Sequence, residues 1–569
     1  MLLDSSRALP LLATLFGPDA ADLLPRLESL AQRHRALLRR MADPGPWTQA
    51  DVFLITYPDQ VLSPGQPPLQ VLSEFCHVHM KQSIGGLHLL PFFPSSSDDG
   101  FAVMDHRLVD PKLGSWQDIH NLVDDFQLMV DLVLNHASAQ GAWFQAFGQG
   151  SSPYESFFLV PDLDADWSKV VRPRASPLFT PFESHAGSLQ VWTTFGPDQV
   201  DFDYRRPEVL LEMLDVLLDY VAHGAKAIRL DAVAYVTKQA GTTCIHLPQT
   251  HALVKLFRLV LRAAAPWVRL ITETNVPHAD NVAYFGEGDE ADLVYQFALP
   301  PLVLHTLATG EAGLLSDWAA APEDPAGDAT FFNFLASHDG IGLNGAHGFL
   351  SADQTRLLVE RAEHCGAVSY RSDPQAGLRP YELNVNLLDF LADSPPESPL
   401  PKEAVPRFLT AHAILLALAG VPAVYFHSLV GSRGDAAGVQ RTGLLRSINR
   451  QKLERAGLEA DLARHGNLRQ TIFDGLGRLL RARRALPAFH PMAQQDVLRD
   501  LPANVFGLER TSIDRKQRLL CLHEVAGRGA TFKVERSGRS GRDALNGGIL
   551  PLAEMSLGPY QARWIEVVP

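Results

Sequence analysis

The sequence predicts an α/β protein: a closed (β/α)₈ barrel of the TIM type, with a small domain inserted after strand 3 and a C-terminal antiparallel β domain. Three observations predict it. The 569 residues exceed one ordinary domain but suit a barrel with added modules. Short hydrophobic runs alternate with helix-like stretches, as in parallel sheets covered on both faces. Beyond residue 488, short strand-like runs are separated by glycine-rich turns instead.

In chain order, residues 1–48 predict helices, because Leu27, Leu30 and Leu38 recur at helical spacing. Eight hydrophobic runs then predict the barrel strands, at residues 51–58, 87–94, 128–136, 227–233, 268–275, 292–299, 330–339 and 421–428. Helix-like stretches such as 208–221 and 251–264 separate most of them. This alternation of strand and helix is what a barrel requires.

Two connections, after residues 136 and 339, are too long for a simple crossover, and long loops at one end of a barrel are where substrate sites are built. We therefore expect five parts. They are a helical extension (1–48), the first part of the barrel (49–136), an inserted domain (137–200), the second part of the barrel (201–487) and a β domain (488–569).

Composition excludes several classes of protein. A formal net charge of −14 and a pI of about 5.8 argue against a nucleic-acid-binding protein, which needs a basic face. The four cysteines show no CxxC pair or metal-ligand spacing and are expected to be reduced thiols. The most apolar stretch, 411–426, is short and broken by Gly420 and Pro422, so no membrane span is expected. With no signal-peptide pattern at the N-terminus, we expect a cytoplasmic protein.

Polar residues recur where the predicted strands end. Strand three ends in Asn135 and His136, strand four in Asp231, strand five reaches Glu273, and strand seven ends in His338 and Asp339. A single acidic residue at such a position is as often a salt-bridge partner or a cap. Four strands of one barrel ending in this way indicate an active site, because catalytic residues of barrels lie at the carboxyl ends of the strands.

Asp231 and Glu273 suit retaining glycosyl transfer. That chemistry needs two carboxyl groups about 5 Å apart, one attacking and one protonating the leaving oxygen. Adjacent strands lie about 4.8 Å apart, so carboxyl groups on strands four and five can meet this geometry. Arg229, two residues before Asp231, points to the same side of its strand and is expected to keep Asp231 ionised. Glu273 must hold a proton, which requires some desolvation.

These motifs resemble those of the α-amylase superfamily of glycoside hydrolases, and more narrowly its sucrose phosphorylase branch, over nearly the whole chain. The resemblance implies that Asp231 is the nucleophile, Glu273 the acid/base, and Asp339 the carboxylate that binds sugar hydroxyls and distorts the ring. It also implies five residues that hold the glucose: Asp98, Phe101, His136, Arg229 and His338. For Phe101, plain core packing is the alternative.

Further stretches resemble the phosphate side of that branch. Arg174, within Arg172-Pro173-Arg174, matches a loop that presents an arginine to phosphate, although such a tripeptide is usually a solvated turn. Tyr381 matches the tyrosine of a mobile acceptor loop, here 365–384, and Tyr235 matches a residue near the incoming phosphate.

Two departures concern the leaving group. Sucrose phosphorylases carry a histidine where this chain has Asn275, and a glutamine where it has Glu382. The stretches 244–251, 272–278 and 431–435 instead resemble the glucosylglycerate phosphorylases of the branch. The leaving group is then glycerate, an anion, and Arg379 and Arg433 are candidates for its carboxylate from charge and loop position.

The resemblance thus implies a glycosyltransferase that acts as a retaining phosphorylase. It would convert 2-O-α-D-glucosyl-D-glycerate and phosphate reversibly into α-D-glucose 1-phosphate and D-glycerate. Inorganic phosphate is the co-substrate, and no metal or organic cofactor is expected, since the insertion shows no ligand cluster to accompany Asn135. A homodimer is one option for its assembly.

Several alternatives remain open at this point. The leaving group would differ in a sucrose phosphorylase or in a phosphorylase of glucosylglycerol or sucrose 6′-phosphate. The acceptor would differ in an α-glucosidase or transglucosidase. A non-catalytic barrel that serves as a binding protein is disfavoured, because all three catalytic carboxyl groups are present.

Overall fold

A computed structural model describes residues 3–38, 43, 45–174, 176–321, 325–373, 377–534 and 540–568. Eight parallel strands form its closed barrel: β1 (Phe53–Thr56), β3 (Gly86–Leu89), β4 (Gln127–Val133), β9 (Ala225–Asp231), β10 (Arg269–Thr272), β11 (Leu293–Tyr295), β12 (Thr330–Asn333) and β16 (Val421–Tyr425). The strand order around the barrel is β1-β16-β12-β11-β10-β9-β4-β3. Each of the eight predicted strand runs contributes one of these strands, so the predicted fold class is confirmed.

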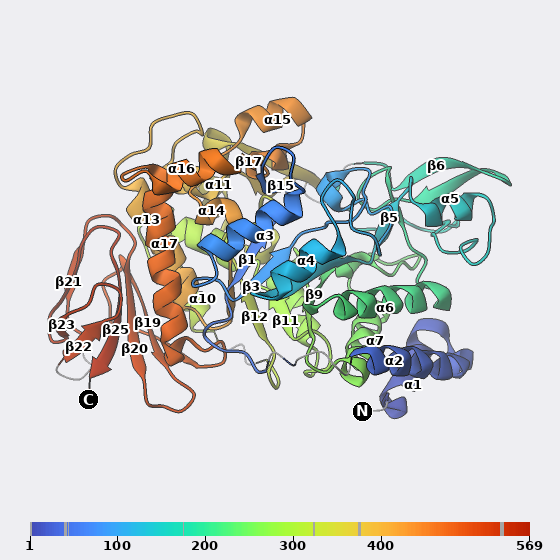
Figure 1. The fold of residues 1–569 in the computed structure, drawn as a ribbon, viewed down its shortest axis with the longest axis horizontal. Helices are drawn as coiled ribbons and strands as arrows, with labels where there is room; N and C mark the ends of the chain where they lie inside the picture. Colours follow the sequence, from blue (N-terminus) through green and yellow to red (C-terminus); the bar gives the residue numbers. More distant parts are fainter. Residues whose placement is uncertain are drawn as a thin grey trace.

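Helices surround the barrel and bury one face against it (Figure 1). The principal ones are α3 (Pro68–His79), α4 (Trp116–Val123), α6 (Pro207–Ala222), α7 (Pro248–Ala264), α9 (Leu299–Thr309), α11 (Ala352–Cys365), α13 (Ala404–Ala417) and α17 (Leu468–Ala485). A proline begins α6 and α7, where the absent N–H is not needed. The buried residues of α7 include Leu253, Leu256, Phe257, Val260 and Leu261, which recur at helical spacing.

The inserted domain follows β4 and comprises β5 (His136–Ser138), α5 (Ala142–Gly148), β6 (Phe179–Ser184), β7 (Gly187–Trp192) and β8 (Gln199–Asp201). The third barrel strand was predicted to continue to His136, but β4 ends at Val133. His136 instead begins β5, which pairs antiparallel with β8 and places His136 opposite Asp201. The apolar run continues past the strand because the chain turns out of the barrel into a buried connection.

The N-terminal helices α1 (Ser5–Phe16) and α2 (Leu24–Leu38) pack beside α6 and α7 (Figure 1). Arg33 and His34 of α2 contact Asp215 of α6 at 2.5 and 2.7 Å. Residues 1–2, 39–42 and 44 of the predicted extension lie outside the described residues.

After β12 the chain forms a β-hairpin, β14 (Ala367–Asp373) and β15 (Gly377–Asn384), and β15 also pairs with β13 (Ile341–Gly342). This hairpin occupies most of the stretch 365–384 that resembles an acceptor loop. Its pairing is irregular between Ser369 and Tyr370, close to where Tyr381 leaves the ladder. Residues 374–376 of this stretch lie outside the described residues.

The C-terminal part forms an antiparallel sheet beside α17 (Figure 1). Its strands, in spatial order, are β18 (Gln494–Val497), β19 (Val505–Thr511), β20 (Arg518–Glu524), β25 (Ala562–Val568), β22 (Ser540–Asp543) and β23 (Ile549–Pro551). A separate pair consists of β21 (Ala530–Phe532) and β24 (Met555–Leu557). The predicted domain from residue 488 also contains 535–539 and 569, which are not among the described residues.

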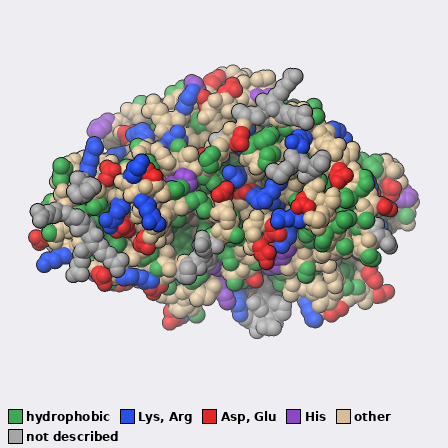
Figure 2. Space-filling model, turned by 90° about the horizontal axis from the view of Figure 1, so that it is seen from below, with side chains coloured by type: hydrophobic (Ala, Val, Ile, Leu, Met, Phe, Trp, Pro, Cys, Tyr) green, Lys and Arg blue, Asp and Glu red, His purple; other side chains and the backbone are tan. Residues whose placement is uncertain are grey.

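Surface features agree with an ordinary globular protein. Figure 2 shows acidic and basic side chains interspersed over one face, rather than gathered by sign among the side chains drawn in colour. Within the described ranges, every helix is too short or too polar to cross a membrane. All four cysteines are buried and unpaired.

Candidate active site

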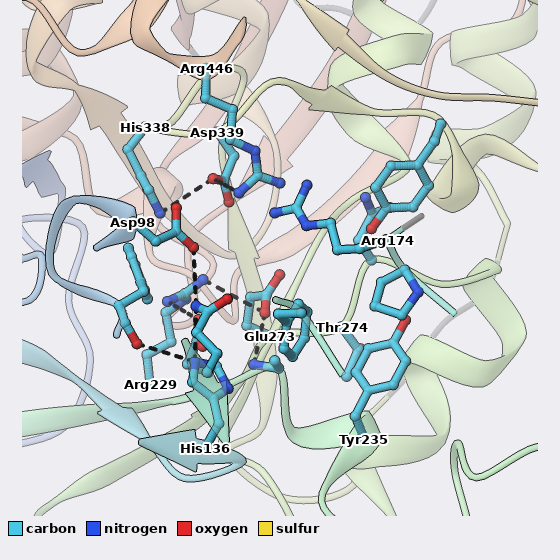
Figure 3. Close-up of a pocket in the computed structure, with 18 residues that line it drawn as sticks. Asp98, His136, Arg174, Arg229, Tyr235, Glu273, Thr274, His338, Asp339 and Arg446 are labelled. Carbon is cyan, nitrogen blue, oxygen red and sulfur yellow. Dashed lines mark hydrogen bonds and ion pairs between the residues drawn. The ribbon is translucent and has the colours of Figure 1, made fainter. Parts of the chain in front are cut away.

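A pocket opens at the carboxyl ends of the barrel strands, where most of the predicted site residues meet (Figure 3). The space is about 650 Å³ and open to solvent on one side. The inserted domain contributes Arg174, Phe195 and Gln199 to its wall, and the β14–β15 hairpin contributes Tyr381. The barrel supplies its floor, so the two long connections singled out from the sequence enclose the site.

Asp231 and Glu273 lie side by side at the base of this pocket. Asp231 ends β9, and Glu273 directly follows β10, whose Thr272 pairs with Leu230. Both carboxyl groups face the same guanidinium. Arg229 Nη1 donates to Asp231 Oδ1 at 2.9 Å, and Arg229 Nη2 lies 3.7 Å from Glu273 Oε2. The register of the parallel strands therefore brings the two carboxyl groups together, as the sequence predicts.

A backbone turn fixes Glu273. Ala232, directly after Asp231, has a φ of 49°, in the left-handed region that residues other than glycine seldom adopt. Its N–H donates to Glu273 Oε2 at 3.0 Å. Strain of this kind persists where the surrounding structure imposes it, typically at functional sites. Oε2 is thus engaged by the backbone, and the other oxygen of Glu273 is left for the pocket.

Arg229 is itself held from below by Asp131 of β4. Arg229 Nη1 lies 2.5 Å from Asp131 Oδ1, and His88 Nε2 lies 3.1 Å from Asp131 Oδ2. Burial alone would raise the pKa of Asp131, but the charges of Arg229 and His88 lower it to about 2. The guanidinium also lies 5.4 Å above the ring of Tyr295. Arg229 is thereby immobilised beneath the two catalytic carboxyl groups.

The pKa values of both catalytic carboxyl groups are raised. Burial raises the pKa of Asp231 well above 3.8 and the pKa of Glu273 above 4.5, while Arg229 opposes both shifts. The expectation that Arg229 alone keeps Asp231 ionised is therefore incomplete, because Arg229 also neutralises Asp131. Since each carboxylate raises the proton affinity of the other, the shift belongs to the pair. The pair retains a proton that a solvated carboxyl group would lose.

Asp339 has the opposite environment. Its Oδ1 lies 2.5 Å from Arg446 Nη1 and 3.3 Å from Arg450 Nη2. Burial would raise the pKa of Asp339, but the charges of Arg446 and Arg450 hold it far below its usual range. Asp339 is therefore ionised at any working pH. Burial lowers the pKa of His338 to about 3, so this imidazole is neutral.

Asp98 and Phe101 approach the pocket from a strained turn. Asp98 and Asp99 have φ values of 55° and 48°. Asp98 Oδ2 accepts a hydrogen bond from Gln199 Nε2 at 3.3 Å, and Arg450 Nη1 lies 2.6 Å from Asp99 Oδ2. The Phe101 ring stacks on His338 at 5.1 Å and lines the pocket, so it is both packed and exposed to the site.

His136 lines the same pocket from β5, the first strand of the inserted domain. Its Nε2 lies 3.1 Å from the carbonyl oxygen of Phe101 and 3.2 Å from Gln199 Nε2. Burial lowers the pKa of His136. Asp98, His136 and His338 lie on the side of the pocket away from Tyr235 (Figure 3), and Phe101 also lines this pocket.

At the open end, Arg174, Tyr235, Asn275 and Tyr381 line the pocket. Glu382 does not line this pocket. It is 2% exposed, accepts from the N–H of Gly340 at 2.7 Å, and pairs with Arg446 at 3.0 Å. Glu382 therefore acts on the pocket through Arg446 and lines an adjoining recess.

The two arginines assigned to the leaving group are not brought into the pocket. Arg433 contacts Asp389 and donates to the carbonyl oxygens of Ser398 and Pro395. Its guanidinium therefore stabilises the segment 395–398 and does not face the pocket. Arg379 is exposed on β15 and is absent from the pocket lining among the described residues. The assignment of Arg433 was wrong because charge and loop position do not tell which way a side chain points.

Several lining residues were not predicted. They are Phe195, Gln199, Thr274 and Arg446, with Arg450 directly behind them. Arg446 and Arg450 come from a 3-10 helix and its end (Leu445–Asn449 and the next residue), after the last barrel strand. No periodicity or strand-end pattern marks that segment, so only its tertiary position reveals the two arginines.

Residues that could hold a metal lie elsewhere. The side-chain oxygen of Asn135, the residue considered for a metal, accepts a hydrogen bond from Lys238 Nζ at 2.9 Å, and this ammonium lies 2.5 Å from Asp201. In the part of the chain that the structure describes, the one candidate ligand group is His364, Cys365 and Asp393, outside the pocket.

Comparisons with known proteins agree with this geometry. Residues 80–323 match the family model "Alpha amylase, catalytic domain". A glucosylglycerate phosphorylase of Allomeiothermus silvanus is 46% identical over 560 residues, which covers 97% of each chain. A sucrose phosphorylase of Agrobacterium vitis is 33% identical over 467 residues, or 77% of this chain and 88% of the other. A crystal structure of sucrose 6F-phosphate phosphorylase from Thermoanaerobacter thermosaccharolyticum matches with a TM-score of 0.73 at 25% identity, covering 86% of this chain and 95% of that one. The chain belongs to the α-amylase family, in the branch that contains the glucosylglycerate and sucrose phosphorylases.

Proposed function

We propose that the chain is a retaining α-glucoside phosphorylase. It converts 2-O-α-D-glucosyl-D-glycerate and phosphate reversibly into α-D-glucose 1-phosphate and D-glycerate. The observation that carries this proposal is the carboxyl pair Asp231 and Glu273, which share the single guanidinium of Arg229. The 46% identity to a glucosylglycerate phosphorylase over 97% of both chains supports the choice of substrate.

In the first step, Asp231 attacks C1 of the glucosyl group from below. The bond from C1 to the glycerate oxygen breaks, and the bond from C1 to the Asp231 carboxylate forms. Glu273 gives its proton to the departing oxygen, so neutral hydroxyl rather than alkoxide leaves. The product is a β-glucosyl-enzyme.

The contacts of Arg229 favour this division of roles. Its Nη1 makes a 2.9 Å hydrogen bond with Asp231, whereas its nearest approach to Glu273 is 3.7 Å. A charge-assisted hydrogen bond stabilises the ionised form of its acceptor. The proton shared by the pair therefore belongs on Glu273, whose oxygen not bound by Ala232 carries it into the pocket.

In the second step, phosphate enters from the side that glycerate left. Glu273, now a carboxylate, takes a proton from phosphate, and the phosphate oxygen attacks C1. The bond to Asp231 breaks, and α-glucose 1-phosphate forms with net retention of configuration. Arg174 suits this step, because a guanidinium binds phosphate with two parallel hydrogen bonds.

The remaining residues hold the glucose. Asp339, kept ionised by Arg446 and Arg450, accepts from sugar hydroxyls, and neutral His338 and His136 donate to them. Phe101 offers its ring face to the positive charge that develops at the ring oxygen and C1. The reaction needs no metal or organic cofactor, because side chains supply nucleophile, acid and charge. Because the reaction consumes inorganic phosphate, we place this activity in the cytoplasm.

The direct test measures α-glucose 1-phosphate formed from 2-O-α-glucosylglycerate, sucrose and 2-O-α-glucosylglycerol, each with and without phosphate. Phosphate-dependent product from glucosylglycerate far above the other two donors is the expected result. Product from sucrose instead would overturn the leaving group and keep the mechanism. Free glucose formed at the same rate without phosphate would make the protein a hydrolase.

A further inference from the structure

Three guanidinium groups line the pocket, and two of them are already committed. Arg229 is shared by Asp131, Asp231 and Glu273 at the base. Arg446 lies between Asp339 and Glu382, at 2.5 and 3.0 Å. An anion that approached either would compete with carboxylates that are buried and already hydrogen-bonded. Neither guanidinium is therefore available to bind the anionic end of a substrate.

Arg174 is the third, and its position differs. Its side chain points into the pocket, toward Arg446 (Figure 3), and Tyr235 lines the same pocket. It makes no hydrogen bond or ion pair with any of the residues that the structure describes. A guanidinium at a pocket wall without a carboxylate partner is suited to a ligand that brings its own negative charge.

A second cation reaches the same place from the hairpin. The Arg371 guanidinium of β14 lies 5.6 Å from the centre of the Tyr381 ring, and Tyr381 lines the pocket. Arg371 pairs in register with Arg379 of β15, so one face of the hairpin carries two positive charges. Burial raises the pKa of Tyr235, and the charges of Arg371 and Arg174 both act to lower it. Arg174 thus lines the pocket from the inserted domain, and Arg371 adjoins the pocket through its contact with Tyr381 on the hairpin.

The chemistry of the two half-reactions brings two anions to this mouth. With net retention, the leaving group departs from the face of C1 that phosphate later attacks. In glucosylglycerate the carboxylate oxygens are three bonds from the leaving oxygen. In phosphate the free oxygens are two bonds from the attacking oxygen. Both ligands therefore place negative oxygens in the same small volume beyond C1, one after the other.

We infer that Arg174 and Arg371 form one anion site, which binds the carboxylate of the leaving group in the first half-reaction and phosphate in the second. The inference rests on the proposed function and adds Arg371, which nothing in the sequence pattern marks. Because the same two cations bind both ligands in turn, the leaving group must carry a negative charge, as phosphate does. It also replaces Arg379 and Arg433 as the groups that recognise glycerate.

The test compares the second half-reaction for two acceptors of different charge. At saturating α-glucose 1-phosphate, kcat/KM is measured for D-glycerate and for glycerol, which lacks the carboxylate. At saturating glucosylglycerate, kcat/KM is measured for phosphate. The variants are Arg371→Met, which keeps an unbranched side chain without the charge, and Arg371→Lys, which keeps the charge. Arg356→Met is the matched control, since Arg356 is 64% exposed on α11 and pairs with Asp353 and Glu360.

For Arg371→Met we expect kcat/KM to fall by roughly tenfold to a hundredfold for glycerate and by a similar factor for phosphate, the worth of a charged hydrogen bond. Glycerol should lose much less, Arg371→Lys should regain part of the loss, and Arg356→Met should behave as wild type.

Three results would overturn the inference. A loss for only one anion means separate sites, an equal loss for glycerol means that Arg371 merely supports the hairpin, and no loss means that it binds neither anion. Failure of the proposed function looks different: the wild-type chain itself would then transfer glucose to fructose and not to glycerate, before any variant is compared.

Discussion

At the scale of single residues, the carboxyl groups of the site differ in pKa because they have different numbers of cations around them. Asp339 has two arginines and a lowered pKa, whereas Asp231 and Glu273 share one arginine with Asp131 and have raised values. Asp339 can therefore bind sugar hydroxyls as a carboxylate, while the Asp231 and Glu273 pair keeps the proton that Glu273 needs as the acid. Each assigned role can be tested by a single substitution.

Asp231→Asn should lower kcat for phosphorolysis by roughly 10⁴-fold or more, because the covalent intermediate cannot form. The shape of the side chain is kept, so the melting temperature should change little. Formation of α-glucose 1-phosphate and thermal unfolding measure the two effects. Wild-type turnover in this variant would exclude Asp231 as the nucleophile.

Glu273→Gln should affect donors according to their leaving groups. Glycerate leaves as an alcohol and needs the proton of Glu273, whereas fluoride leaves from α-glucosyl fluoride without one. We therefore expect a far greater loss of kcat/KM for glucosylglycerate, by about 10²-fold to 10⁴-fold, than for the fluoride. Equal losses for both donors would argue against an acid role.

The pH dependence follows from the raised pKa of the carboxyl pair. The donor kcat/KM requires a protonated Glu273 and an ionised Asp231. It should therefore fall at low pH, where Asp231 takes up a proton, and fall again as the pH rises through the pKa of Glu273. Because burial raises the pKa of Glu273 above 4.5, the fall at high pH should come at a higher pH than for a solvated glutamate. Asp339, with its lowered pKa, should contribute no limb in the same range. A profile for Glu273→Gln with α-glucosyl fluoride that keeps the wild-type alkaline limb would contradict this origin.

At the scale of elements, the inserted domain is joined to the barrel by a buried cation. Lys238 follows the β9 turn, is 3% exposed, and bridges Asn135 at the end of β4 to Asp201 of β8. Asp201 is fully buried and also accepts from Thr194 and Asn135. The same bridge sets the position of His136, which neighbours Asn135 and faces the pocket.

Lys238→Met should destabilise the protein by about 3–5 kcal/mol, because it leaves the buried Asp201 charge without its cationic partner. Lys516→Met is the control: Lys516 is 85% exposed and pairs with the exposed Asp514. Chemical denaturation of both variants gives the difference in unfolding free energy. Equal losses of unfolding free energy in both variants would show that the ion pair of Lys238 and Asp201 contributes no more than an exposed pair to joining the inserted domain to the barrel.

At the scale of the whole molecule, the β domain and barrel are locked by buried arginines. Arg510 of β19 is fully buried and donates to the carbonyl oxygens of Ala417, His490 and Ala493. Ala417 ends α13, so this side chain joins the C-terminal sheet to a barrel helix. Arg483 of α17 is equally buried and donates to Leu416 and Phe489. These contacts predict that barrel and β domain unfold together.

Arg510→Met should lower the unfolding free energy by about 2–5 kcal/mol, since three buried carbonyl oxygens lose their donor. Calorimetry should show a single transition at a lower temperature. Arg499→Met, which removes an exposed arginine paired with exposed Asp317, serves as the control. Two separate transitions in the wild-type protein would show that the β domain unfolds independently of the barrel.

The sequence by itself determined the barrel, the approximate positions of its eight strands and the core of the site. Hydrophobic runs report burial directly, and parallel register carries Asp231 and Glu273 to one edge without further information. It could not determine where charged loop residues point. Arg446 and Arg371 enter the site or its rim while Arg433 turns away, although all three are loop or hairpin arginines with no periodic pattern around them. Which loop folds over which strand end depends on packing between residues distant in the chain, and that information exists only in the tertiary structure.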